Sequence, residues 1–214
     1  MYTPDHFTES DAARIDQVIH DHPLAALVAM GPQGLVANHL PLLRDGDGFV
    51  GHVALANDLH RDLPDGAAVL AIFRGAEGYV SPNWYPSKAE THRAVPTWNY
   101  QVVHVHARIR WSHAERDRRR AVSLLTARHE AATQGAAAWR MGDAPADFLA
   151  QHLARIVAFR LEVTRVEAKS KLNQNRDARD IAAVAERFEA QGKDGLARAM
   201  RGTPDPRSDV TPMT

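Results

Sequence analysis

The sequence predicts a mainly β fold, an antiparallel barrel with peripheral helices, and two observations carry that prediction. Six or seven strand-like runs follow one another through the first half and reappear near residue 160, most of them separated by tight-turn signals. Helical periodicity precedes and follows these runs instead of alternating with them, which argues against βαβ units and a parallel sheet. We therefore expect one sheet that closes on itself, with helices around it.

The N-terminal element is predicted to be a short helix. Thr8 and Asp11 match the pattern of a hydroxyl followed three residues later by an acid, and Ile15, Val18 and Ile19 then share one helical face. Pro23 ends this helix. Apolar or alternating runs then predict four strands, at 24–30, 34–43, 49–57 and 67–73, with the Asp-Gly turn at 44–48 joining the second to the third.

The stretch from Ile72 to Arg110 is the part of the chain around which we expect the function to be organised. A strand ending at Phe73 and a strand over 97–111 enclose a long loop, and loops of that length are usually either functional or disordered. Tyr79, Trp84 and Tyr85 make disorder the weaker interpretation, because disordered segments are poor in aromatic residues. Along the second strand a period of two assigns Val103 and its alternate neighbours to the core.

The C-terminal part is predicted to contain helices from Ala114 and over 145–155, a strand over 156–168, a helix over 177–190 and a further short helix before Met200. We expect a single domain with flanking helices over residues 1–200 and a flexible tail over 201–214.

Composition restricts the function classes. The chain has 214 residues with 26 basic and 26 acidic side chains, so its net charge favours neither nucleic acid nor an anionic membrane as partner. Cysteine is absent, which excludes disulfides and thiolate chemistry and fits a cytoplasmic location. We find no apolar run near the roughly 18 residues that a membrane span needs. Dinucleotide-binding glycine patterns, phosphate loops and nucleophile elbows are also missing.

Four groups of residues could carry chemistry. His104 and His106 point the same way on a strand, a weak signal for a metal or haem, and spacing supplies no third ligand, so we predict no metal site. Polar and small residues in the 37–57 hairpin leave a ligand and plain packing equally favoured. The aromatic loop and the strand after it suit a planar heteroaromatic ligand. Lys169, Lys171 and the amides after them could bind a phosphate, although a solvated loop is nearly as good an interpretation.

With these residues assembled, the chain resembles the PaiB-like family of FMN-binding negative transcriptional regulators. The matching segments run through nearly the whole length: MYTPDHF at the start, ANHLP at 37–41, GHVALAN at 51–57, YVSPNWYPSK at 79–88, VPTWNY at 95–100, LTARHE at 125–130 and KLNQNR at 171–176. The resemblance implies an FMN-binding split β-barrel similar to pyridoxamine phosphate oxidases, usually a homodimer with two FMN sites made by both subunits.

The resemblance also assigns roles to the candidate residues. The hairpin would face the flavin with backbone groups that read the ring edge, and Lys169 and Lys171 would reach the phosphate or the flavin carbonyls from the partner chain. The residues implied to bind the cofactor are Asn38, His39, Leu40, Pro41, Gly51, His52, Val53, Ala54, Asn57, Ser81, Trp98, Asn99, Tyr100, Lys169, Lys171 and Gln174. Catalytic residues are not identified.

Four positions depart from the family pattern, Leu55, Asp58, Ser170 and Asn173, and these changes remove a cation and an aromatic ring beside the expected site. Three functions therefore stay open at the level of sequence. The first is a flavoprotein with FMN-dependent oxidoreductase activity. The second is a regulator that binds DNA or protein without turnover, for which the charge pattern gives DNA no support. The third is a haem-binding split barrel.

Overall fold

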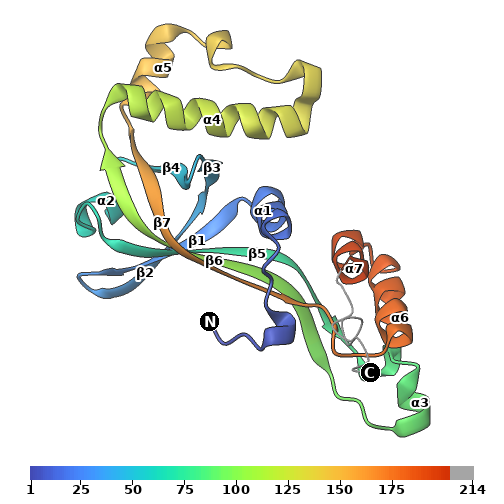
Figure 1. Ribbon diagram of the computed structural model, residues 1–214. Coiled ribbons are helices and arrows are strands. Elements are labelled where there is room, and N and C mark those ends of the chain that lie inside the picture. The colour runs from blue at the N-terminus through green and yellow to red at the C-terminus, as the bar shows by residue number, and fades with distance from the viewer. Residues whose placement is uncertain (203–214) are drawn as a thin grey trace, which may run out of the picture. The chain divides into compact units, whose positions relative to one another are not determined.

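The computed structural model describes residues 1–202, and its contacts divide this part of the chain into two compact units (Figure 1). Unit 1 comprises Met1–Asp21, Arg74–Val103 and the residues from Glu167 onward. Unit 2 comprises His22–Phe73 and His104–Val166. Three long strands belong partly to each unit, and each unit is described below by itself.

One seven-stranded sheet forms the framework, with the hydrogen-bonded order β2-β1-β5-β6-β7-β4-β3. Its strands are β1 (Leu24–Gly31), β2 (Gly34–Pro41), β3 (Leu43–Asp45), β4 (Gly48–Ala54), β5 (Ala68–Val80), β6 (Thr97–Ser112) and β7 (Ile156–Lys171). The pairs β1–β2, β1–β5, β3–β4 and β4–β7 are antiparallel and lie in unit 2. In unit 2 β2 also contacts β4, its counterpart near the other end of the order, so the sheet curls towards closure.

The core of unit 2 follows the period of two along its strands. Phe49, Phe73, Val105 and Ile109 are all fully buried, and the rings of Phe49 and Phe73 lie 5.5 Å apart. The predicted assignment of Val103, Val105, Ala107 and Ile109 to the core is therefore confirmed, whereas Trp111, predicted on the same face, is half-buried. Leu161 of β7 completes the same interior.

The helices of unit 2 are α2 (Leu59–Asp62), α4 (Glu115–Gln134) and α5 (Ala146–Leu153), with the 3₁₀ turns η3 (Gly135–Ala137) and η4 (Met141–Asp143) between the last two. Helix α4 packs on β4 through Ala121 and Leu125 in its first half, and α5 lies beside α4 (Figure 1). Glu115 and Asp117 stand in the first turn of α4, where acidic side chains complement the helix dipole.

Unit 1 contains η1 (Asp5–Phe7), α1 (Ala12–Asp21), η2 (Pro82–Trp84), α3 (Ser87–Thr91), α6 (Ala178–Glu189) and α7 (Asp194–Arg201). Helices α6 and α7 pack on each other. Their apolar faces join a core that includes Val80, Tyr85, Leu172, Phe188 and Met200. Among the described residues no helix is long and apolar enough to cross a membrane.

The mainly β, antiparallel fold class with flanking helices is confirmed, and several element boundaries are corrected. Strand β5 continues to Val80 rather than ending at Phe73, and buried positions recur beyond that residue at Gly75, Gly78 and Val80. The first helix begins at Ala12, and Asp11 rather than Thr8 accepts a backbone N–H there, from Ala13 at 2.9 Å. The strand expected over 34–43 breaks after Pro41, β4 ends at Ala54 rather than Asn57, and β7 runs on to Lys171.

The predicted single domain over residues 1–200 stays a prediction. Of the predicted tail, Arg201 ends α7, and 203–214 lie outside the described residues.

Candidate functional site

In unit 2 the candidate residues lie on two strand edges that no neighbouring strand pairs. Strand β2 pairs only with β1, and β3 pairs with β4 only as far as Val50. Among the described ladders, the outer edges of β2 and of residues 51–54 of β4 are therefore open. Unpaired strand edges present rows of N–H and C=O groups. Since β2 and β4 also contact each other, the segments 38–41 and 51–54 gather such groups in one region of unit 2.

The amides of Asn38 and Asn57 hold this region together. Asn57 Nδ2 donates to Asn38 Oδ1 at 2.8 Å, and Asn57 Oδ1 accepts from the backbone N–H of Leu59 at 2.9 Å. Asn57 thus connects β2 to the start of α2. The pairing of the two amides explains why both are polar at half-buried positions, so their first role is to fix the hairpin.

His52 is the polar group of β4 that lacks a partner. Its Nδ1 is buried and makes no hydrogen bond with the described residues. Burial lowers the pKa of His52 below the ordinary histidine value, which keeps the imidazole neutral near pH 7. A neutral ring with one unpaired buried nitrogen can donate to or accept from a ligand.

Three predicted residues of the hairpin are explained by packing. A Cβ on Gly51 would lie 2.5 Å from the Phe159 ring, so this glycine makes room for a core side chain. Val53 is 2% exposed, and Leu40 is half-buried on the face of β2 that meets the core. Only the backbones of these residues remain available to a ligand. His39 and Ala54 are exposed, and Pro41 is half-buried.

In unit 1 the candidate residues centre on two lysines of β7. Lys169 is 8% exposed, and its Nζ donates to the Tyr2 carbonyl at 3.1 Å. The same ammonium lies 5.7 Å from the ring centre of Tyr2 and 5.4 Å from that of Tyr100. Among the described residues Lys169 forms no ion pair with a carboxylate. A buried charge that lacks a counter-charge is costly, so this arrangement favours an anion from outside the chain.

Lys171 follows on the same face of the strand. Its Nζ donates to the Trp98 carbonyl at 3.0 Å and to Thr97 Oγ1. Burial, and then the charge of Lys169, lower the pKa of Lys171 below the ordinary lysine value. The two ammonium groups therefore act on one region, and an anion there would relieve their repulsion.

The N-terminal segment supplies aromatic rings that the sequence did not single out as site residues. Phe7 is buried with its ring centre 6.0 Å from Lys171 Nζ, and Tyr2 contributes both a carbonyl and a ring to Lys169. A backbone bridge between Thr8 and Lys169 fixes the segment along β7. The signal was present in the MYTPDHF stretch, but only the structure shows that it pairs with a strand some 160 residues later in the sequence.

Trp98, Asn99 and Tyr100 divide between the two faces of β6. Alternation places Trp98 and Tyr100 on one face and Asn99 on the other. Asn99 is fully buried, donates to the Met200 sulfur at 3.4 Å and leaves its Oδ1 without a partner among the described residues. Trp98 and Tyr100 can therefore border one ligand, whereas Asn99 anchors α7 from the other face.

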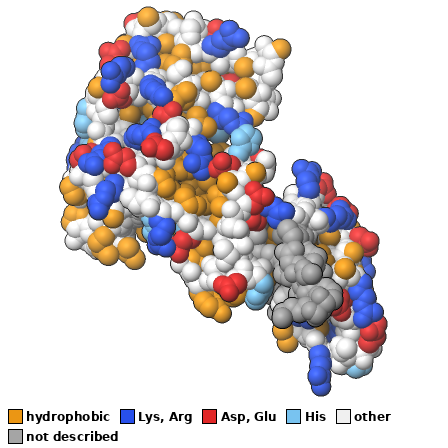
Figure 2. All heavy atoms as spheres, viewed as in Figure 1, with side chains coloured by type: hydrophobic (Ala, Val, Ile, Leu, Met, Phe, Trp, Pro, Cys, Tyr) orange, Lys and Arg blue, Asp and Glu red, His pale blue; other side chains and the backbone are white. Residues whose placement is uncertain are grey.

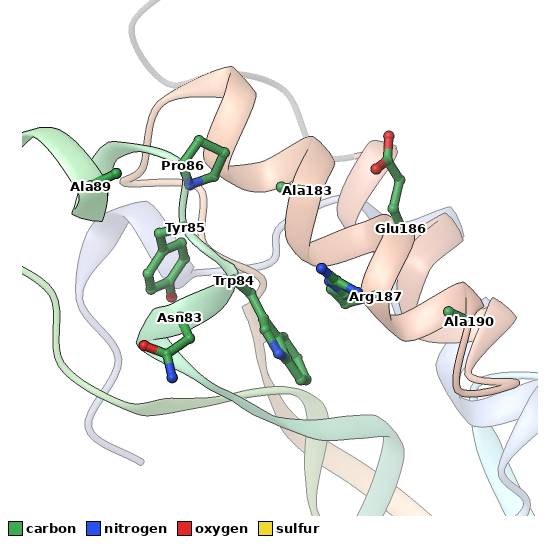
Figure 3. Close-up of a pocket in the computed structure, with 9 residues that line it drawn as sticks. All are labelled: Asn83, Trp84, Tyr85, Pro86, Ala89, Ala183, Glu186, Arg187 and Ala190. Carbon is green, nitrogen blue, oxygen red and sulfur yellow. The ribbon is translucent and has the colours of Figure 1, made fainter.

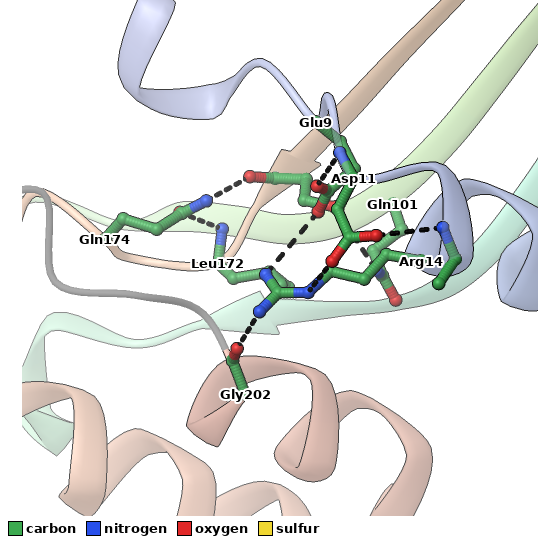
Figure 4. Close-up of polar contacts among 9 residues, drawn as sticks. Glu9, Asp11, Arg14, Gln101, Leu172, Gln174 and Gly202 are labelled. Carbon is green, nitrogen blue, oxygen red and sulfur yellow. Dashed lines mark hydrogen bonds and ion pairs between the residues drawn. The ribbon is translucent and has the colours of Figure 1, made fainter.

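Ser81 and Gln174 hold turns. Ser81 Oγ accepts from the Asn83 N–H at 3.2 Å at the start of η2. Gln174 Oε1 accepts from the Leu172 N–H at 2.7 Å, and its Nε2 donates to the Ser170 carbonyl, which closes the turn after β7 (Figure 4). In the same view Arg14 bridges Glu9, Asp11 and the Gly202 carbonyl. The side-chain groups of Ser81 and Gln174 are thus used internally.

The histidines do not assemble a metal centre within the described part of the chain, where no group of three potential ligands is close enough to hold an ion. His106 Nε2 lies 2.9 Å from an Arg165 guanidinium nitrogen. A haem remains a prediction that no contact within residues 1–202 supports.

The sequence and the fold of this chain are similar to those of known proteins. Residues 1–165 match the family described as "Putative FMN-binding domain". The chain belongs to this family. Protease synthase and sporulation protein PAI 2 of Bacillus subtilis is 28% identical over 194 residues, which cover 88% of this chain and 89% of that protein. The predicted resemblance to the PaiB-like family is thereby confirmed, and a flavin is the cofactor of this FMN-binding domain.

Solved structures support the same fold. The FAD and heme binding protein of Mycobacterium smegmatis aligns with a TM-score of 0.59 at 20% identity, covering 82% of this chain and 79% of that one. The flavocytochrome Anf3 of Azotobacter vinelandii aligns with a TM-score of 0.52 at 16% identity, covering 77% and 69%. At these identities the likeness concerns the fold, the split barrel.

The described residues of this chain, which include Lys169 beyond the matched segment 1–165, fit the cofactor. Its phosphate requires cationic or N–H donors, and Lys169 is a buried cation without a carboxylate among the described residues. The edge of the flavin ring carries hydrogen-bond donors and acceptors, which suit the open strand edges and the unpaired His52 Nδ1.

Proposed function

We propose that this FMN-binding domain acts as a homodimeric flavoprotein in which Lys169 and Lys171 of one subunit hold the FMN phosphate or ring carbonyls of the site on the other. The observation that carries the proposal is the buried ammonium of Lys169, whose partners are a carbonyl and two aromatic rings. A phosphate dianion would supply the missing charge. Tyr2 and Tyr100 then border the anion with apolar surface.

The ring of the cofactor is assigned to the open edges of unit 2. Backbone groups of 38–41 and 51–54 would read its polar edge, with His39 and His52 as adjacent side chains. Asn38 and Asn57 act as positioning residues, because their mutual hydrogen bond fixes the β2 edge. FMN supplies electron transfer when it is bound, and the chain's own residues bind and orient it.

The homodimer is supported by an uncovered apolar face of unit 2. Leu24, Val28 and Met30 of β1 lie on this face, opposite Pro41, Ala37 and Leu35 of β2. Met30 is 66% exposed and Leu35 76%. An antiparallel sheet usually has one wet face, whereas here both faces of β1 are apolar, and apolar patches of this kind mark association surfaces. Val28→Glu should produce monomers in sedimentation velocity, and Val166→Glu, at another exposed apolar position, should not.

The absorbance spectrum of the purified protein tests the proposal. We expect flavin absorbance, with the released cofactor identified as FMN by chromatography, and saturable FMN binding by protein that has been stripped of it. Riboflavin should bind more weakly because it lacks the phosphate. A colourless protein that fails to bind added FMN would exclude the proposed cofactor site, whatever the oligomeric state.

The similarity to PAI 2 favours a regulator as the second candidate. That relative carries sporulation in its name and matches 88% of this chain. On the surface shown in Figure 2, acidic and basic side chains are interspersed over both units, so this view offers no basic stripe for DNA. A regulator of this kind would act through protein partners. Gel-shift titration at physiological salt tests the DNA-binding version of the regulator, which only salt-resistant, promoter-specific binding would favour.

A further inference from the structure

A second ligand-sized cavity lies within unit 1, apart from the lysine pair. It is a groove of about 580 Å³ between the segment 83–89 and helix α6 (Figure 3). This volume falls in the range of small-molecule sites. Its main walls are Trp84, Pro86 and Ala89 on one side and Ala183, Arg187 and Ala190 on the other. None of these residues belongs to the predicted flavin site.

Both sides of the groove are held in place by buried or paired groups. Asp180, 1% exposed, accepts hydrogen bonds from Ser87 N at 3.0 Å and Ser87 Oγ at 2.6 Å, which fixes the start of α3 on α6. Arg179 forms a two-pronged ion pair with Glu90, with distances of 2.5 and 2.6 Å. The groove is therefore preformed, so a ligand would not have to order its walls.

The Trp84 indole is a flat aromatic wall of the groove, and open space lies beside it. The Trp84 ring meets Phe188 edge-to-face, at 5.6 Å between ring centres and 88° between planes, which sets the orientation of the indole. Ala183 of α6 and Ala190, the residue that caps the end of α6 with helical backbone angles, lie seven residues apart and therefore on one helical face. Their small side chains leave room beside the indole for a planar ring, and such rings favour offset or edge-on contact with tryptophan.

Arg187 is the charged group that faces this space. Figure 3 shows its side chain reaching from α6 towards Trp84; Glu186 also lines the groove, and in this view its carboxylate points away from Trp84. Within the described part of the chain, Arg187 makes no hydrogen bond or ion pair. Arg179, on the same helix, donates to both carboxylate oxygens of Glu90, whereas Arg187 has no such acceptor among the described residues. A guanidinium with free donors recognises carboxylates in a planar, two-pronged geometry.

We propose that this groove binds a small aromatic carboxylate, with its ring beside Trp84 and its carboxylate on Arg187. The ligand class follows from the flat wall, the alanine-lined space and the single inward-facing cation. The site is separate from the proposed flavin site and does not depend on it. It gives the FMN-binding domain a second small-molecule input within unit 1.

Titration calorimetry with 1-naphthoate and its neutral amide, 1-naphthamide, tests the inference on the full chain. We expect 1-naphthoate to bind more tightly than the amide. Arg187→Gln should weaken 1-naphthoate about 10-fold, the loss of one charge-assisted contact, and leave 1-naphthamide unchanged. Arg198→Gln removes a positive charge of the same kind from an exposed position of α7 that does not line the groove, and it should change neither affinity.

Space in the groove is tested by filling it. Ala190→Leu should abolish binding of both probes, and Ala182→Leu, at an exposed α6 position outside the lining, should leave both unchanged. Thermal melting establishes that each variant folds, and Ala183→Leu replaces Ala190→Leu if the latter does not. The inference is overturned if the wild type binds no 1-naphthoate, if Arg187→Gln weakens both probes equally, or if the folded groove-filling variant still binds.

Discussion

The arginine cluster of unit 2 and the lysine pair of unit 1 differ in the partners of their positive charges, which are carboxylates in the first and neutral groups in the second. Arg120 and Arg160 both meet the carboxylate of Asp45, at 2.9 and 3.1 Å, and Arg110 meets Asp65 and Glu162 at 3.0 and 2.9 Å. Lys169 and Lys171 instead meet carbonyls, a hydroxyl and aromatic rings.

Exposure makes this contrast informative. The paired arginine side chains are 37 to 52% exposed, so water could have solvated them without any partner. Lys169 is more deeply buried than these arginines, and it has no counter-ion among the described residues. Paired, exposed charges are typical of structural surface networks, whereas a buried, uncompensated charge is typical of a ligand site. Substitutions in the arginine cluster should therefore change only the free energy of unfolding, whereas substitution of Lys169 should change the affinity for the ligand.

The largest expected effect comes from removing the buried charge. Lys169→Met should weaken FMN binding about 30- to 150-fold, because a charge-assisted contact with a phosphate contributes about 2–3 kcal/mol. Riboflavin affinity should change little, since riboflavin has no phosphate. Flavin fluorescence titrations measure both affinities.

Lys193→Met is the matched control. Lys193 also donates to a carbonyl, that of Glu77 at 3.1 Å, and lies 5.9 Å from the Phe188 ring centre, but it is exposed. This variant should bind FMN like the wild type. Equal losses for FMN and riboflavin in Lys169→Met would contradict the phosphate assignment and leave flavin binding itself intact.

The arginine cluster should give a smaller effect of another kind. Asp45→Asn breaks the contacts with Arg120 and Arg160 and should lower the free energy of unfolding by about 1 kcal/mol, because both arginines are partly exposed. Asp47→Asn removes a 96% exposed carboxylate from Arg160 and should be nearly neutral. Urea denaturation gives both values. A selective loss of FMN affinity in Asp45→Asn would remove the distinction between the two clusters.

Sequence patterns predicted the sheet better than they predicted the site. The alternation along β6 gave the core positions Val103, Val105, Ala107 and Ile109 correctly, because strand geometry fixes which residues share a face, although Val102 on the opposite face is buried as well. The same rule separates Asn99 from Trp98 and Tyr100, although motif membership had grouped the three. Gly51 looked equally suited to a ligand and to packing, and only the position of the Phe159 ring decides for packing.

Long-range pairing explains what the sequence could not predict. The lysines of β7 acquire aromatic neighbours from the N-terminal segment, a contact that no local spacing encodes. The family resemblance implied that Gln174 and Ser81 bind the cofactor, yet both satisfy nearby backbone groups. Local hydrogen bonds of this kind compete with ligand binding and are visible only once the turn is known.

His52 shows that unit 2 also contains a polar group without a partner, because its buried Nδ1 makes no hydrogen bond with the described residues. Its pKa is lowered by burial, so the folded state resists protonation more than the unfolded state does. Stability should be complete above the unfolded histidine pKa, near 6.5, and should fall as the pH decreases from there towards the folded pKa. Urea midpoints across this range should show this fall in the wild type and lose it in His52→Gln; an unchanged slope would assign the loss to other groups.

The smallest expected effect concerns Lys171 and the upper end of the pH range. Burial and the charge of Lys169 lower its pKa, so its ammonium is lost at a lower pH than that of an ordinary lysine. The preference for FMN over riboflavin should therefore decrease by a few-fold as the pH rises through that pKa, because only the protonated amine attracts the phosphate. Lys171→Arg should keep the preference constant over the same range, since a guanidinium stays charged. Riboflavin shares the ring system and cancels any titration of the flavin itself. An identical decrease in Lys171→Arg would show that Lys171 does not contact the anion, and would leave Lys169 as the cation that defines the site.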